Sequence, residues 1–218
     1  MKKVLLISLF NLFIINAYSQ SLGTWNVLDF RKKLNEKVNF QFEGQLRSLE
    51  FYNKFHYHEL NFTANFKQND NLTLSGLLGK HNTYSDGGNF KSPLVTDEIR
   101  LSVQALTTQK FNKVILDNRY RLEQRYFFNS QQFAYRARVR IGLSSYILPT
   151  FKVQMSNEFF LALGTKNSTF EKNRFTIGFA KSFNKKFETQ VNYLNQKDNR
   201  TSDESGTKFL QIIQIIYL

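Results

Sequence analysis

The stretch KVILDNRYRLEQRYFFNSQQFAYRARVRIGL, residues 113–143, decides the fold of this chain. Successive side chains of a β-strand point to opposite faces, so every second residue shares a face. In both arms of the stretch, arginines and acidic residues occupy one face, while Leu, Tyr, Val and Ile occupy the other. A short polar break near Ser130 separates the arms. The pattern predicts a β-hairpin with one apolar face and one arginine-rich face.

Two architectures can use such a hairpin. A soluble β-sandwich buries the apolar face and leaves the arginines in water, whereas an outer-membrane barrel turns the apolar face to lipid and the charges to its lumen. Residues 38–49 alternate almost without fault, which is longer than the usual strand of roughly five or six residues. We therefore expect an all-β, antiparallel transmembrane barrel. A soluble periplasmic sandwich or barrel that binds an acidic ligand stays open as the alternative.

The N-terminus indicates export. Lys2 and Lys3 precede an apolar run over residues 4–15, and Ala17-Tyr18-Ser19 has the small-x-small form of a cleavage site. This predicts a signal peptide over residues 1–19 and a barrel domain over residues 20–218. The chain has no Cys, which excludes disulfides, thiolate metal sites and cysteine nucleophiles. We expect the outer membrane of a Gram-negative bacterium as the location, with lipid and lipopolysaccharide as its surroundings.

The same alternation divides the rest of the chain into strands, with Trp25 expected as an anchor at the membrane interface. Tight polar turns alternate with longer polar loops, as in barrels with short periplasmic turns and longer external loops. Bacterial single-chain barrels have an even number of strands, so 10 to 12 are expected and 12 are favoured over the eleven segments that alternate. These segments are residues 22–30, 38–49, 55–66, 72–84, 96–106, two arms within 113–143, 151–163, 174–181, 187–196 and 208–218.

The predicted lumen is rich in arginine. Antiparallel pairing places Glu123 opposite Arg136 or Arg138, and Glu158 opposite one of the same two arginines. Several arginines thus have carboxylate partners, and a surplus of cations remains. The inward arginines are Arg100, Arg119, Arg121, Arg125, Arg136, Arg138, Arg140 and Arg174, and the inward carboxylates are Glu98, Asp117, Glu123 and Glu158.

The charge balance bears on function. The net charge of +13 becomes +11 without Lys2 and Lys3, which favours anionic partners. Export argues against nucleic acid, so small anionic solutes are the better candidates. The arginines can line a narrow, porin-like, anion-preferring channel, or they can fill a non-conducting structural or accessory barrel with salt bridges. His56 and His58 share the outward phase, and no third metal ligand or catalytic partner is recognisable, so we expect no enzyme, metal or cofactor.

Several short motifs, in order along the chain, resemble one protein family. The chain is similar to DUF2490, a family of uncharacterised bacterial proteins expected to be outer-membrane barrels. The resemblance runs from Trp25 to the C-terminus. It implies the barrel fold and brings no known activity. The motifs are Gly23-Thr24-Trp25, Lys32-Lys33-Leu34, Leu46-Arg47, NRYRLEQRY at 118–126, YRAR at 135–138, NEFF at 157–160 and NRFTIG at 173–178.

Overall fold

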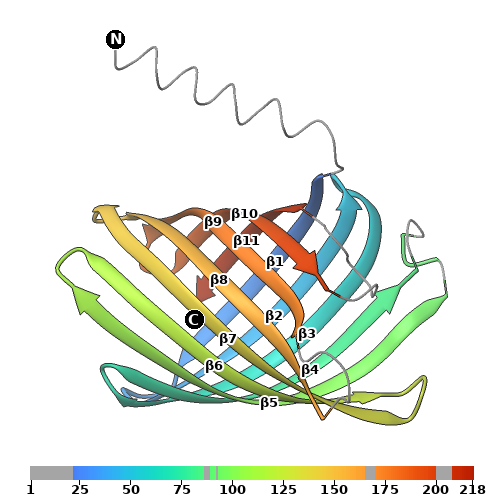
Figure 1. The fold of residues 1–218 in the computed structure, drawn as a ribbon. Coiled ribbons are helices and arrows are strands. Elements are labelled where there is room, and N and C mark those ends of the chain that lie inside the picture. The colour runs from blue at the N-terminus through green and yellow to red at the C-terminus, as the bar shows by residue number, and fades with distance from the viewer. Residues whose placement is uncertain (1–21, 86–88, 92, 165–169, 200–207) are drawn as a thin grey trace.

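The computed structural model describes residues 22–85, 89–91, 93–164, 170–199 and 208–218. These residues form eleven strands that close into one barrel (Figure 1). The predicted signal peptide lies outside the described residues. The strands are β1 (Leu22–Lys33), β2 (Val38–Glu50), β3 (Asn53–Asn69), β4 (Leu72–Tyr84), β5 (Leu94–Phe111), β6 (Val114–Phe127), β7 (Gln132–Leu148), β8 (Phe151–Leu163), β9 (Phe170–Asn184), β10 (Phe187–Asp198) and β11 (Lys208–Tyr217).

Each strand pairs with its neighbours in the chain, and β1 pairs with β11 to close the wall. The closing pair is parallel and runs from Leu22 opposite Lys208 to Arg31 opposite Tyr217, whereas the other ten pairs are antiparallel. The expected even number is therefore not found in the described chain. The even-number rule assumes antiparallel pairing throughout, and a parallel closing pair allows an odd number.

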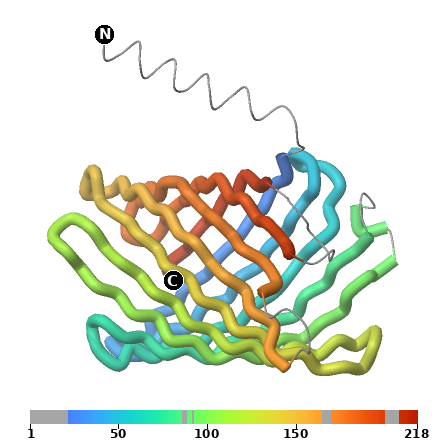
Figure 2. The backbone as a smooth tube through the Cα atoms, in the orientation of Figure 1, coloured from blue at the N-terminus to red at the C-terminus, as the bar shows by residue number. Residues whose placement is uncertain are grey.

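The strands are inclined to the barrel axis, and the connections differ between its two ends (Figure 2). At one end, here the tight-turn end, strands are joined by two to four residues, as at residues 112–113 and 185–186. The other, the long-loop end, includes two connections of nine residues, over residues 85–93 and 199–207. No helix among the described residues is long and apolar enough to cross a membrane.

The side chains divide by period two between the outside and the inside of the wall. On β5, Leu101 and Val103 are 56% and 60% exposed, while Glu98 and Ser102 between and beside them are 1% and 5% exposed. The same alternation continues round the barrel, so the outer surface is apolar and the interior is polar. This is the inside-out arrangement that the hairpin over residues 113–143 predicts.

The interior has a small apolar cluster of its own. Trp25, Val27, Leu194 and Phe209 are buried together on β1, β10 and β11. The expectation that Trp25 anchors the outer surface is wrong, because its ring lies inside the wall, 4% exposed, and its Nε1 donates a hydrogen bond to Gln45. Trp25 shares the inward phase of Val27, and the sequence pattern of β1 is too mixed to reveal which face is which.

Candidate functional site

The interior encloses a cavity of about 630 Å³ that is lined by side chains from all eleven strands. Among the described residues, eleven cationic and six acidic side chains line it, so five more positive than negative charges face the cavity. The cations are Arg31, Arg47, Arg100, Arg119, Arg121, Arg136, Arg138, Arg140, Lys152, Lys172 and Arg174, and the acids are Asp29, Glu43, Glu59, Asp117, Glu123 and Glu158.

Arginines concentrate on the wall formed by β5 to β9, which is called the arginine wall below. Every arginine predicted from the sequence as an inward residue belongs to it, and seven of the eight line the cavity. The eighth, Arg125, is held by Glu98, which accepts hydrogen bonds of 2.6 and 2.8 Å from it and of 2.5 and 3.0 Å from Arg100. These three side chains form a closed ion-pair group beside the cavity.

Two further carboxylates each hold several arginines. Glu123 accepts hydrogen bonds from Arg136 at 2.7 Å and from Arg138 at 2.9 Å. Glu158 accepts hydrogen bonds from Arg119 at 2.6 Å and from Arg138 at 2.9 Å. Arg138 therefore bridges the two carboxylates, and all five side chains act as one network across β6, β7 and β8.

The strand registers refine the predicted pairing. Glu123 is predicted to lie opposite Arg136 or Arg138, and the residue directly opposite it is Arg136. The prediction for Glu158 is wrong, because the residue directly opposite it on β7 is Arg140. Glu158 nevertheless bonds to Arg138, since a long guanidinium side chain reaches a diagonal neighbour. Asp117, the remaining predicted carboxylate, accepts a hydrogen bond from Thr108 at 2.8 Å.

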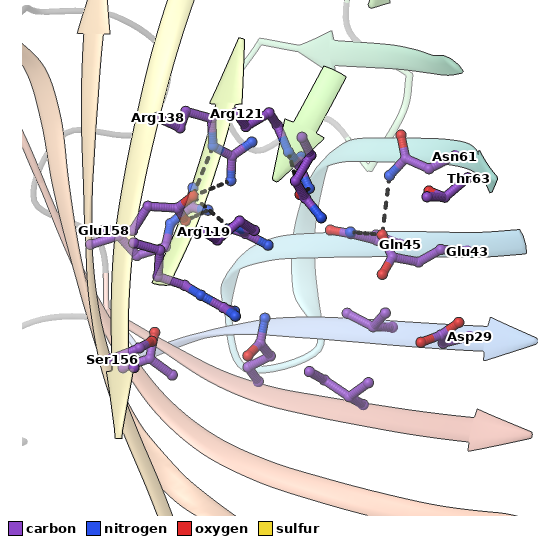
Figure 3. A pocket seen from close by; sticks show the side chains of 18 of the residues that line it. Asp29, Glu43, Gln45, Asn61, Thr63, Arg119, Arg121, Arg138, Ser156 and Glu158 are labelled. Carbon is purple, nitrogen blue, oxygen red and sulfur yellow. Dashed lines mark hydrogen bonds and ion pairs between the residues drawn. The ribbon is translucent and has the colours of Figure 1, made fainter. Parts of the chain in front are cut away.

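Acids and amides occupy the opposite wall, formed by β1, β2 and β3. Asn61 and Gln45 both donate hydrogen bonds to Glu43, at 3.1 and 2.5 Å. Arg31 donates a bond of 2.7 Å to Asp29 at the same side. Figure 3 shows this wall facing Arg119 and the other arginines across the cavity. The cavity is therefore polarised, with a basic side and a side rich in amides and carboxylates.

An aromatic group crosses the interior toward the long-loop end. The Arg47 guanidinium carbon lies 3.6 Å from the ring centre of Trp25 and 3.9 Å from that of Tyr57. The Arg174 guanidinium carbon lies 4.7 Å from Trp25 and 4.9 Å from Phe160. Cation–π contacts of this kind bind the guanidinium groups without neutralising them. They link β1 to β8 through the interior.

Seven of the charged residues that line the cavity are not among those identified from the sequence: Arg31, Arg47, Lys152, Lys172, Asp29, Glu43 and Glu59. Glu43 and Arg47 lie on the polar face of the predicted strand over residues 38–49, so alternation alone could have found them. Asp29 could not be found in this way, because apolar Trp25 and Val27 precede it on the same face. The described residues contain no cluster of three or more His, Asp or Glu suited to a metal ion.

His56 and His58, which are separated by Tyr57 and are expected on the outer face, lie near the long-loop end of β3. His58 is on the outer side, where its ring centre lies 5.7 Å from Tyr84 and 5.5 Å from Phe90. His56 is completely buried. Both histidines are expected to face lipid or an aromatic belt near the rim. The aromatic neighbours of His58 agree with this expectation, whereas the complete burial of His56 rules out a lipid-facing position there.

A family model described as a protein of unknown function, DUF2490, matches residues 22–207. The chain belongs to the DUF2490 family. The resemblance stated from the short motifs is thereby confirmed. No curated protein matches this DUF2490 chain.

Among solved structures, the DUF2490 barrel is similar to an anion-selective porin from Comamonas acidovorans, with a TM-score of 0.40 and 10% sequence identity. The match covers 86% of this chain and 54% of the porin chain. The DUF2490 barrel thus spans about half the length of that porin.

Proposed function

We propose that this DUF2490 barrel spans the outer membrane of a Gram-negative bacterium and admits small anionic solutes to its lumen. The observation that carries the proposal is the cavity lining, with its surplus of five positive charges. Rings and tracks of arginine select anions because they lower the energy of a negative solute in a narrow passage. Arginine also binds carboxylate and phosphate groups through two parallel hydrogen bonds.

The outer surface supports the proposed membrane location. Large side chains such as Leu101, Leu122 and Ile141 are exposed on neighbouring strands, at 56%, 54% and 48%. A contiguous apolar surface of this extent is unfavourable in water and is suited to lipid. The predicted signal peptide and the tight-turn end agree with insertion from the periplasm, with the turns on the periplasmic side. Lipid and the acyl chains of lipopolysaccharide are then the neighbours of the outer surface.

A barrel of eleven strands lies between two known regimes. Eight strands leave an interior that side chains fill, whereas 16 to 18 strands leave a wide aqueous channel. The cavity of about 630 Å³ supports a passage, and the contacts of Arg174 with Trp25 and Phe160 support a constriction. A non-conducting barrel that binds anions without passing them is the second candidate, and this constriction is the observation that favours it.

The test is reconstitution of the folded chain in a planar lipid bilayer, with conductance and reversal potential recorded in a KCl gradient. We expect discrete conductance steps with a reversal potential that indicates anion preference. Arg121→Gln removes a lumen charge, and Lys113→Gln removes a charge from an exposed tight turn as the matched control. The Arg121 variant should lose part of the preference, and the Lys113 variant should keep it.

The alternatives have distinct outcomes. A folded barrel that gives no steps is the non-conducting barrel. A chain that stays monodisperse in buffer without detergent is the soluble barrel, and it would refute the membrane location. Equal ion preference in the wild type and the Arg121 variant would contradict the role of the arginine wall.

A further inference from the structure

The arginine wall contains three pairs of arginines that face each other directly on adjacent strands. They are Arg100 opposite Arg125, Arg121 opposite Arg138, and Arg119 opposite Arg140. Like charges directly opposite each other in a sheet are destabilising. An anion close by offsets this repulsion, and the three pairs differ in whether the chain itself provides one.

The first two pairs have a carboxylate of the chain. Glu98 accepts two hydrogen bonds from each member of the Arg100 and Arg125 pair. Glu123 lies 2.9 Å from Arg138 and 3.7 Å from Arg121. In both cases one carboxylate neutralises part of the repulsion.

In the Arg119 and Arg140 pair, no carboxylate among the described residues forms an ion pair with both members. Glu158 bonds to Arg119 but also holds Arg138 at 2.9 Å and lies 4.0 Å from Arg174. No ion pair or hydrogen bond joins Arg140 to any described residue of the chain. The Nε atoms of Arg119 and Arg140 are both buried without a hydrogen-bond partner. Buried polar donors without a partner are rare, and each one requires an explanation.

We propose that the Arg119 and Arg140 pair binds the carboxylate group of a small, hydroxylated monocarboxylate solute. Both arginines line the cavity, so a solute in the lumen reaches them. The chain itself provides the precedent, because Glu98 places one carboxylate between two opposed guanidinium groups in the same wall. The bound carboxylate takes the place that a third acidic side chain would have.

The neighbouring charges distinguish a carboxylate from a phosphate dianion. Asp117 occupies the adjacent inward position on β6, diagonal to Arg140, and Glu158 lies directly opposite Arg140 on β8. These two negative charges repel a second charge on the ligand more strongly than a single one. The pair therefore favours a singly charged carboxylate.

The opposite side of the cavity indicates what the rest of the solute carries. Amide side chains both donate and accept hydrogen bonds, which suits hydroxyl groups rather than a second charge or an apolar chain. Figure 3 shows Gln45 and Asn61 across the cavity from Arg119. The amides of this opposite wall that line the cavity are Asn39, Gln41, Gln45, Asn61 and Asn65.

This inference deepens the proposed function, since it names the solute class for the same lumen. The experiment is isothermal titration calorimetry on the full, folded barrel in detergent, with glucuronate as the probe and with glucose and inorganic phosphate for comparison. Arg140→Gln removes the unpaired guanidinium, and Lys152→Gln removes another lumen charge as the matched control. Asp117→Asn removes a repulsive charge without changing the side-chain shape.

We expect glucuronate to bind the wild type more tightly than glucose or phosphate. A charge-assisted hydrogen bond lost in Arg140→Gln should raise the Kd of glucuronate roughly ten- to hundredfold. Lys152→Gln should change the Kd much less, and Asp117→Asn should lower it. An unchanged Kd in Arg140→Gln, or binding of glucose or phosphate as tight as that of glucuronate, would overturn the proposal.

Two further measurements distinguish a variant that fails to fold, and a barrel that does not conduct, from a barrel that lacks the binding site. Should Arg140→Gln not fold, Arg140→Lys keeps the charge but loses the planar fork, and it should still weaken glucuronate binding. The proposed site would be overturned if glucuronate bound Arg140→Lys as tightly as the wild type and bound Asp117→Asn no more tightly than the wild type. Glucuronate binding that depends on Arg140 in a barrel without conductance would refute the channel and leave the site. Conductance without such binding would refute the site alone.

Discussion

Substitution of Glu158 by Gln tests the central network of the lumen. Glu158 is 4% exposed, it bonds to Arg119 and Arg138, and Arg174 lies within 4.0 Å. The glutamine keeps the shape but leaves three guanidinium groups without their shared negative charge. Breaking a buried ion pair by removing one partner costs about 3–5 kcal/mol, because the other charge remains buried. We expect a loss of about 3 kcal/mol in the free energy of unfolding, since the glutamine oxygen still accepts one hydrogen bond.

The assay is urea unfolding of the barrel in lipid vesicles, followed by the fluorescence of Trp25, the only tryptophan of the chain. The control is Glu36→Gln, which removes an exposed ion pair with Lys33 and should leave the unfolding curve unchanged. Adding Arg140→Gln to the Glu158→Gln variant should restore part of the stability, because one repelling charge is removed. A loss below about 1 kcal/mol in the single variant would refute the view that this carboxylate holds the arginine wall together.

Two other substitutions test the barrel wall, one its outer face and the other its close packing. Leu101→Arg places a charge on the outer face of β5 and should cost about 2–4 kcal/mol of stability in lipid. Equal stability of that variant and the wild type in vesicles would contradict a lipid-facing position. Gly178→Ala should destabilise the barrel by about 1–3 kcal/mol, because the added Cβ would lie 2.2 Å from the carbonyl oxygen of Val191. Gly142→Ala, with its nearest atom at 3.6 Å, is the tolerated control, and equal unfolding curves for the two variants would refute the packing argument.

The alternation of apolar and polar residues with a period of two predicted the strands of the barrel and which of their side chains point inward or outward. The prediction succeeds because the outer face of the strands carries mainly apolar side chains and the inner face mainly polar and charged ones, so a shift by one residue would exchange them. The inward placement of Arg119, Arg121 and Arg138 follows from this rule alone. The rule needs no knowledge of which strands are neighbours, and a single sequence therefore suffices for it.

The pairing that closes the barrel, and the contacts between particular side chains in its interior, could not be predicted in the same way. The parallel pairing of β1 with β11 joins segments from the two ends of the described chain, and no local pattern specifies its direction. The position of Trp25 depends on the cavity that it meets, where Arg47 and Arg174 stack on its ring. The failure at Glu158 has a smaller cause, since an error of two residues in the register between β7 and β8 changes the residue opposite it from Arg140 to Arg138.

The charge balance of the cavity argues that the lumen is hydrated. A lumen filled only by side chains would pair nearly every buried charge, because an unpaired charge removed from water costs several kcal/mol. The described lining has eleven cations and six acids. Three carboxylates outside this lining, Glu98, Glu171 and Asp198, pair with Arg100, Arg136 and Lys172 and offset part of the surplus. The remaining positive charge is stable only where water and mobile anions solvate it. A cavity of about 630 Å³ holds on the order of twenty water molecules. The surplus at Arg140 is thus evidence for solvent in the barrel, and the same solvent gives anions access to the Arg119 and Arg140 pair.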